Sequence, residues 1–228
     1  MTSFPPTLRS CCQRFLNTAE RRPRMRLASL LFLFDLIRDV PGDIVELGVA
    51  SGESLRMWFH FIAEHDGSKR TLWGFDTFAG FPSFAPEDGV EIPMIGKRIG
   101  GETEIRDRPT TKQEVVASLL AMFQSSWRSD VYGKLVEGDI TVTLRKHTPP
   151  SPLALVFCDA DLYTPTKAAI DLLWSRLAPG GLIIFDEYGQ EPWPGEKKAV
   201  DDFIAVNPGL ILERLDMESG PTALVVKP

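Results

Sequence analysis

Short apolar runs alternate with helix-spaced segments along most of the chain. The runs that predict strands bounded by turn residues are residues 43–47, 71–76, 134–137, 153–158 and 182–185. Residues 153–158 are continuously apolar, as in a strand buried on both faces of a parallel sheet. Helical spacing of apolar positions predicts helices at residues 8–20, 24–39, 53–65, 111–123 and 196–206.

Proline and glycine mark where several of these elements should begin or end. Pro23 separates the two helices expected near the N-terminus. A further helix should begin at Pro165, with Thr164 as its N-cap residue. The Pro179-Gly180-Gly181 sequence should stop that helix before the next strand.

This order of elements predicts an α/β fold of the Rossmann-like kind. Its central sheet should be mostly parallel with helices on both faces. The last two expected strands, residues 210–215 and 222–226, should form an antiparallel hairpin at one edge. We expect a single domain over residues 1–228, with an N-terminal helical segment at 1–40. Residues 77–110, rich in glycine, proline and acids, are expected to form a substrate lid.

Composition narrows the class of protein but does not identify a substrate. The 228 residues are 43% hydrophobic and 25% charged, with a formal net charge of -6. These values are ordinary for a globular protein and do not indicate a nucleic-acid surface. The three cysteines include no C-x-x-C pair, so we expect a reducing, cytoplasmic location. The apolar run 27–34 follows four arginines but lacks a cleavage site and is too short to span a bilayer.

Ligands of open α/β sheets bind outside the carboxyl ends of the strands, so the residues that follow each strand are the candidates. After the first strand, residues 46–54 form the glycine-rich turn ELGVASGES, where free backbone N–H groups suit an anion such as the carboxylate of S-adenosylmethionine (SAM). Asp76 ends the second strand and can accept hydrogen bonds from ribose hydroxyls. Asp139 follows the third, where it can read an adenine edge or cap a short helix.

A nicotinamide-dependent oxidoreductase is the first alternative, because it also carries glycines and an acid at these places. Its G-x-G-x-x-G pattern is broken here by Ala50 and Ser51. The acid at position 76 also lies farther from Gly48 than the usual spacing of about 20 residues. The glycines therefore favour SAM weakly, and a tight turn without a ligand stays open for them.

Four acids follow the fourth and fifth strands. Asp159 and Asp161 come after residues 153–158, and Asp186 and Glu187 come after residues 182–185. Carboxylates gathered at one edge of a sheet repel one another unless a cation lies among them. Hard oxygen ligands suit Mg²⁺, with Mn²⁺ or Ca²⁺ as substitutes. The three histidines are not placed to act as a general base.

Three segments resemble signatures of the macrocin O-methyltransferase family. These segments are residues 74–82 (GFDTFAGFP), 159–167 (DADLYTPTK) and 195–203 (GEKKAVDDF). The resemblance covers about residues 25–228. It implies a class I fold and Mg²⁺-assisted methylation of hydroxyls of natural products, commonly sugars or phenols.

The resemblance also assigns roles to individual residues. Asp159, Asp186 and Glu187 are the implied metal ligands, and Asp161 is the implied general base. The family usually has two aspartates after the fifth strand, so Glu187 departs from its pattern. The residues expected to bind SAM are Glu46, Gly48, Ser51, Gly52, Ser54, Asp76, Phe78, Asp139 and Ile140.

We therefore expect a SAM-dependent O-methyltransferase that acts on a small-molecule hydroxyl acceptor. Neither a nucleic acid nor a membrane is an expected partner, and a homodimer stays open. A non-catalytic scaffold with this fold is the second alternative, and it conflicts with the retained acids at positions 159, 161, 186 and 187.

Overall fold

The computed structural model describes residues 21–65, 70–89, 112–124, 131–190, 193–217 and 220–228. The helix expected at residues 8–20, and residues 90–110 of the expected lid, lie outside this part of the chain. The strands are β1 (Asp43–Leu47), β2 (Thr71–Asp76), β3 (Tyr132–Glu137), β4 (Leu153–Cys158), β5 (Leu177–Phe185), β6 (Leu212–Arg214) and β7 (Ala223–Val226). The α-helices are α2 (Arg21–Leu36), α3 (Glu53–His65), α5 (Lys112–Gln124), α6 (Ile140–Lys146), α7 (Tyr163–Leu173) and α8 (Pro194–Ala205). Two 3-10 helices are η1 (Pro86–Asp88) and η2 (Trp174–Arg176).

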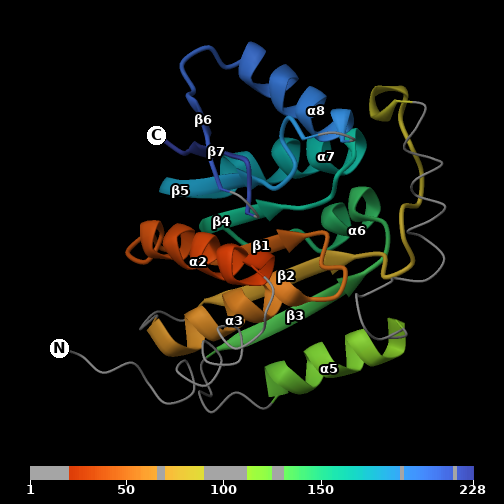
Figure 1. Ribbon diagram of the computed structural model, residues 1–228, viewed down its shortest axis with the longest axis vertical. Coiled ribbons are helices and arrows are strands. Elements are labelled where there is room, and N and C mark those ends of the chain that lie inside the picture. Colours follow the sequence, from red (N-terminus) through yellow and green to blue (C-terminus); the bar gives the residue numbers. More distant parts are fainter. Residues whose placement is uncertain (1–20, 66–69, 90–111, 125–130, 191–192, 218–219) are drawn as a thin grey trace.

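The strands form one sheet in the order β3-β2-β1-β4-β5-β7-β6 (Figure 1). Strands β1 to β5 pair in parallel, whereas β7 pairs antiparallel with both β5 and β6. The predicted fold class and its antiparallel edge are thus confirmed. The strand order reverses between β1 and β4, so the crevice outside their carboxyl ends is where a ligand is expected.

Helices cover both faces of the sheet (Figure 1), and an apolar core lies between the sheet and the helices on each face. One core packs α2, α3 and α5 against the sheet, with Leu33, Trp58 and Leu119 among its buried side chains. The other packs α6, α7 and α8, through side chains such as Leu144, Leu173 and Val200. Helices on both faces explain why β4 is buried at every position.

Two predicted boundaries that were based on proline differ from the structure: the start of α2 and the start of β5. Helix α2 is described from Arg21, so it includes Pro23, which was expected to precede it. Strand β5 begins at Leu177 and includes Pro179, which was expected to precede it. The β4–β5 register shifts between Leu153 and Leu155, and this irregularity accommodates the proline and glycines.

The predicted cap of α7 is also wrong. The helix begins at Tyr163, and Leu162 is the N-cap residue without a side-chain hydrogen bond. Thr164 is exposed in the first turn instead. The cap comes from a distant segment, because Asp88 Oδ1 in η1 accepts a hydrogen bond from Tyr163 N at 2.7 Å.

The amino edge of the sheet is fastened by a buried arginine just before β2. Arg70 is only 2% exposed, and its guanidinium donates hydrogen bonds to the backbone carbonyls of Ile37, Arg38 and Gly42 at 2.8 to 3.1 Å. These carbonyls follow the end of α2 and precede β1, so Arg70 fixes that helix relative to the sheet. Among the described helices, none is long and apolar enough to cross a membrane.

Candidate functional site

The turn after β1 places a buried carboxylate beside the ligand crevice. Glu46 is fully buried, and its Oε1 accepts a hydrogen bond from Ser54 Oγ at 2.8 Å. Its Oε2 is buried and has no partner among the described residues. Burial raises the pKa of Glu46 well above its ordinary value, against the lowering effect of Ser54. Glu46 therefore has one oxygen available for a polar ligand group.

The same turn brings β1 and β4 close together. Gly48 has a φ of +88°, and a Cβ at this position would lie 1.8 Å from the carbonyl oxygen of Asp159. Gly52 is buried against Leu119, while Ser51 is half-buried. A side chain at position 48 would thus push the turn after β1 away from the acids after β4.

Asp76 ends β2 and already organises two neighbouring turns. Its Oδ2 accepts a hydrogen bond from Ala50 N at 2.7 Å, and its Oδ1 accepts one from Phe78 N at 2.5 Å. Each carboxylate oxygen can accept more than one hydrogen bond, so these contacts do not exclude the expected ribose hydroxyls. The structure therefore brings Asp76, Phe78 and the β1 turn together.

Asp139 is the N-cap residue of helix α6, which was one of the two roles expected for it. Its Oδ1 accepts hydrogen bonds from Thr141 N at 2.8 Å and from Thr141 Oγ1 at 2.6 Å. The neighbouring Ile140 is buried. The adenine-binding role of Asp139 and Ile140 stays a prediction.

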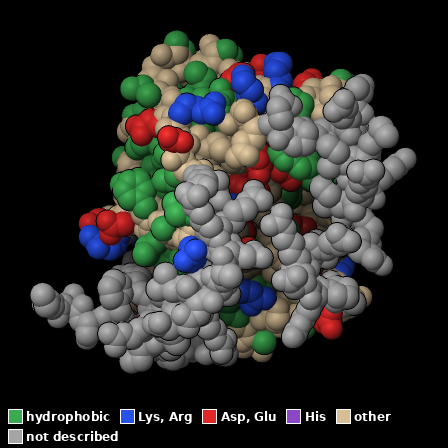
Figure 2. All heavy atoms as spheres, viewed as in Figure 1, with side chains coloured by type: hydrophobic (Ala, Val, Ile, Leu, Met, Phe, Trp, Pro, Cys, Tyr) green, Lys and Arg blue, Asp and Glu red, His purple; other side chains and the backbone are tan. Residues whose placement is uncertain are grey.

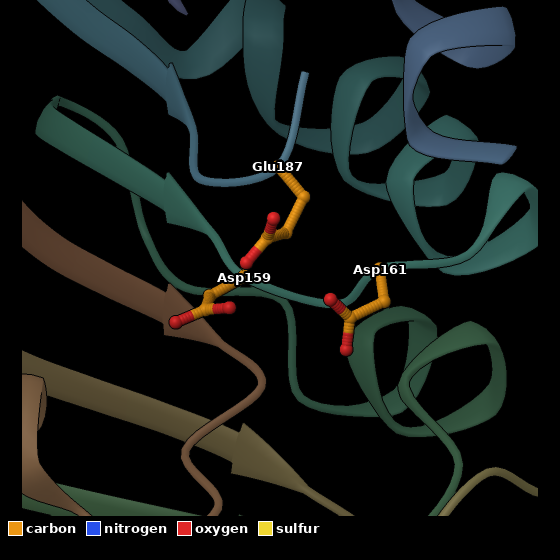
Figure 3. Close-up of side chains that lie close together, drawn as sticks. All are labelled: Asp159, Asp161 and Glu187. Carbon is orange, nitrogen blue, oxygen red and sulfur yellow. The ribbon is translucent and has the colours of Figure 1, made fainter. Parts of the chain in front are cut away.

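Three acids converge at the carboxyl ends of β4 and β5. One carboxylate oxygen from each of Asp159, Asp161 and Glu187 lies within 4.8 Å of the others. In Figure 3, Glu187 points from the segment after β5 toward Asp159, while Asp161 faces them from the turn before α7. Burial, and then the other acids, raise the pKa of Asp161 well above its ordinary value. These oxygens fit a hard divalent cation in number and type.

The fourth expected acid, Asp186, has a different partner. Both of its oxygens accept hydrogen bonds from Arg26 Nη1 at 3.0 Å. Arg26 Nη2 donates to Asp159 Oδ2 at 2.8 Å, so one guanidinium joins the acids after β4 and β5. Burial raises the pKa of Asp186, although Arg26 opposes the rise. The expected ligand set is thus split, because Asp186 pairs with Arg26 and Asp161 joins the other two acids.

Sequence reasoning missed three residues that support this cluster: Arg26, Asp88 and Glu196. Arg26 lies far from the acids in the sequence and gave no local signal. Glu196 is fully buried, and its Oε1 accepts a hydrogen bond from Glu187 N at 2.8 Å. Its position in the resembling segment 195–203 was a signal that could have found it. Glu196 therefore holds the backbone that carries Glu187.

Backbone strain also gathers at this crevice. Three non-glycine residues in the described chain have a positive φ: Ala50 (47°), Phe78 (48°) and Asp161 (62°). They follow β1, β2 and β4 respectively, and such conformations cost free energy that the surrounding contacts must offset. Acidic side chains gather in a hollow near the centre of the face in Figure 2. Together these features mark the carboxyl edge as the candidate site.

A protein-family comparison agrees with this geometry. The model of the family described as macrocin O-methyltransferase (TylF) matches residues 24–210. The chain belongs to the macrocin O-methyltransferase family. The family match spans β1 to β5 and all the acids of the candidate site.

Similar curated proteins are methyltransferases of actinobacterial natural products. A tetracenomycin-type 4'-O-methyltransferase of Streptomyces olivaceus, whose name includes a dimethoxy-rhamnosyl group, is 29% identical over 65% of this chain and 54% of its own length. Mycinamicin III 3''-O-methyltransferase of Micromonospora griseorubida is 30% identical over 67% of this chain and 58% of its own. The chain thus spans less than two thirds of the length of either relative.

Solved structures of similar proteins have the same fold. The calicheamicin methyltransferase CalS11 is 27% identical, with a TM-score of 0.70, over 99% of this chain and 94% of its own. The O-methyltransferase NovP has a TM-score of 0.70 at 24% identity over 90% of this chain and 81% of its own, which supports the fold alone. These methyltransferases do not support the oxidoreductase alternative.

Proposed function

We propose that the chain is a SAM-dependent O-methyltransferase that methylates a sugar hydroxyl of a small-molecule natural product with the help of a divalent cation. One observation supports this proposal most strongly. In a chain of this family, the turn that carries Glu46 and the cluster of Asp159, Asp161 and Glu187 lie at the same edge of the sheet. The sugar acceptor is favoured over a phenol by the rhamnosyl group in the name of one relative.

The cofactor site would be built from the ends of β1, β2 and β3. Glu46 Oε2 is buried without a described partner and suits the ammonium group of an amino acid. Asp76 would accept the ribose hydroxyls, and Asp139 with Ile140 would line the adenine end. SAM supplies the electrophilic methyl group.

The acid cluster would orient and deprotonate the acceptor. Asp159 and Glu187 are proposed to hold the cation, for which Mg²⁺ is the first choice. A bound divalent cation supplies a Lewis acid that lowers the pKa of a hydroxyl group. Asp161, in the same cluster, would accept the hydroxyl proton, and burial among other acids raises its pKa, which makes its carboxylate a stronger base.

Alignment of the acceptor oxygen with the methyl group would provide much of the remaining rate increase.

The aromatic side chains of Phe81, Phe84 and Trp193 pack together, with Phe81 in contact with both of the others. They lie on the segment after β2 and just before α8, next to η1. We propose that this aromatic group forms one wall of the acceptor site.

A methyl-transfer assay tests the proposal directly. The protein is incubated with methyl-labelled SAM, Mg²⁺ and a panel of glycosylated natural products that carry free deoxysugar hydroxyls, with aglycones as matched controls. Label should appear on the glycosides and be lost when a chelator is added. Transfer to the aglycones alone would replace the sugar with a phenol as acceptor.

Cofactor choice is tested by thermal unfolding. SAM at 100 times its dissociation constant should stabilise the protein by about 2.7 kcal/mol, whereas NAD should not. If NAD stabilises the protein and SAM does not, the oxidoreductase alternative replaces methyl transfer.

A further inference from the structure

Arg26 is the cationic side chain that the structure shows bound within the acid cluster. Its Nη1 contacts both oxygens of Asp186, and its Nη2 contacts Asp159 Oδ2. The guanidinium also lies 5.6 Å from the centre of the Phe157 ring. Its side chain is only 18% exposed, so these ion pairs are poorly screened by solvent.

The position of Arg26 is fixed by the helix that carries it. The buried side chains of Leu30, Leu33 and Ile37 hold α2 and the residue that follows it against the sheet. The planar guanidinium fork suits two carboxylates at once, because its donors point in fixed directions. A cation at the carboxyl edge would therefore encounter Asp159, which has one oxygen bound to Arg26, and Asp186, which has both oxygens bound to Arg26.

We propose that Arg26 is a positioning residue that occupies the Asp159–Asp186 side of the cluster and competes with the divalent cation for these two carboxylates. The proposal rests on the proposed function, because it assumes that a cation binds here. With Arg26 in place, Asp159 and Glu187 receive the cation beside Asp161. Asp186 joins them only when Arg26 releases it.

A purely structural ion pair makes a different prediction. If Arg26 only fastened α2 to the sheet, its loss would lower stability equally with and without a cation and leave cation affinity unchanged. Competition instead predicts that loss of the positive charge strengthens cation binding, and that the cation then replaces Arg26 as the partner of the acids.

Calorimetric titration with Mn²⁺, without SAM or acceptor, separates these cases. Arg26→Met should bind Mn²⁺ about tenfold or more tightly than the unchanged protein, because a nearby unit charge no longer repels the ion. Arg26→Lys keeps the charge and should stay within about threefold of the unchanged protein. Arg38→Met is the matched control, since Arg38 lies just beyond the same helix and pairs with Asp35 near the surface.

The melting temperature gives a second readout. Without a cation, Arg26→Met should melt at a lower temperature than the unchanged protein, and Mn²⁺ should remove most of the difference. If Arg26→Met does not fold, Arg26→Gln serves instead, because its amide can still donate a hydrogen bond to a carboxylate. Folding of either variant only with Mn²⁺ supports competition, and failure to fold even with Mn²⁺ overturns it.

The outcomes distinguish this inference from the proposed function. Unchanged or weaker Mn²⁺ binding by Arg26→Met overturns the competition and leaves the methyltransferase proposal standing. Absence of Mn²⁺ binding in both proteins overturns the competition and the metal part of the proposed function. Binding by Arg26→Met alone supports the competition and shows that the unchanged chain excludes the ion.

Discussion

Asp88 Oδ1 accepts a hydrogen bond from Tyr163 N at 2.7 Å, although the two residues are 75 positions apart in the sequence. Asp88 Oδ2 accepts a second one from Ala85 N, also at 2.7 Å. One buried carboxylate therefore holds η1 together and caps α7, whose preceding turn carries Asp161. This side chain connects the segment after β2 to the carboxyl edge of the sheet.

Asp88→Ala should lower the free energy of unfolding by about 2–4 kcal/mol, because it leaves two backbone donors without their partner. Chemical denaturation of the variant measures the change. Glu87→Ala, at the neighbouring and less buried position, is the control and should change stability by less than about 0.5 kcal/mol. Equal effects of the two substitutions would show that the cap contributes nothing specific.

Gly195→Ala should also destabilise the protein, by about 1–3 kcal/mol. A Cβ at this position would lie 1.9 Å from Asp88 Oδ1 and 2.6 Å from Tyr163 N. Alanine has a higher helix propensity than glycine, so helix propensity alone predicts that this substitution stabilises the protein. Gly209→Ala is the matched control, because its Cβ would meet no atom within 4 Å. A Gly195→Ala protein as stable as the unchanged one would contradict the close packing.

Substitutions in the acid cluster should separate proton transfer from cation binding. Asp161→Asn should reduce turnover by about 10²–10⁴-fold, because an amide cannot accept the hydroxyl proton, while cation affinity changes little. Asp159→Asn should weaken cation binding instead. The control is Asp171→Asn, an exposed acid on α7 that pairs with Lys167. Restoration of Asp161→Asn turnover by excess Mg²⁺ would make Asp161 a ligand rather than the base.

Glu46→Gln should change how stability depends on pH. Burial raises the pKa of Glu46 in the folded protein, so this residue favours folding below its ordinary pKa and loses that contribution as pH rises through the raised value. Glutamine does not titrate. Without ligands, the free energy of unfolding of Glu46→Gln should therefore fall less steeply than that of the unchanged protein as the pH rises above the ordinary glutamate pKa of 4.5.

Denaturation at a series of pH values measures this slope, and the exposed Glu53→Gln is the control. Asp159, Asp161 and Glu196 also have raised pKa values, and they keep their contributions in both proteins. Parallel curves for Glu46→Gln and the unchanged protein would show that Glu46 is equally protonated in the folded and unfolded states.

Local patterns in the sequence predicted the sheet well. Strand β4 follows from six consecutive apolar residues, and the bounds of β1, β2 and α3 agree with their predicted ranges. The carboxyl-edge rule then brought together acids that are distant in sequence, such as Asp159 and Glu187. These features depend on the spacing of apolar residues and on the parallel pairing of strands, and both can be inferred from local sequence patterns.

Contacts between distant segments were not predictable in the same way. The cap of α7 comes from Asp88, so Thr164 beside Pro165 was a false local signal. Arg26 reaches Asp186 across 160 positions, and only the packing of α2 on the sheet brings the two together. Assigning Asp186 as a ligand from family resemblance could not take this guanidinium into account.

Arg70 and Arg26 make polar contacts near opposite ends of helix α2. Helix α2 has 16 residues and is about 24 Å long. Arg70 grips the backbone just beyond its carboxyl end, whereas Arg26 reaches the acids from its amino-terminal half. A small displacement at the amino edge of the sheet would therefore travel along the helix axis and move a positive charge among the carboxylates. The proposed cation site would therefore depend on contacts at the opposite edge of the sheet.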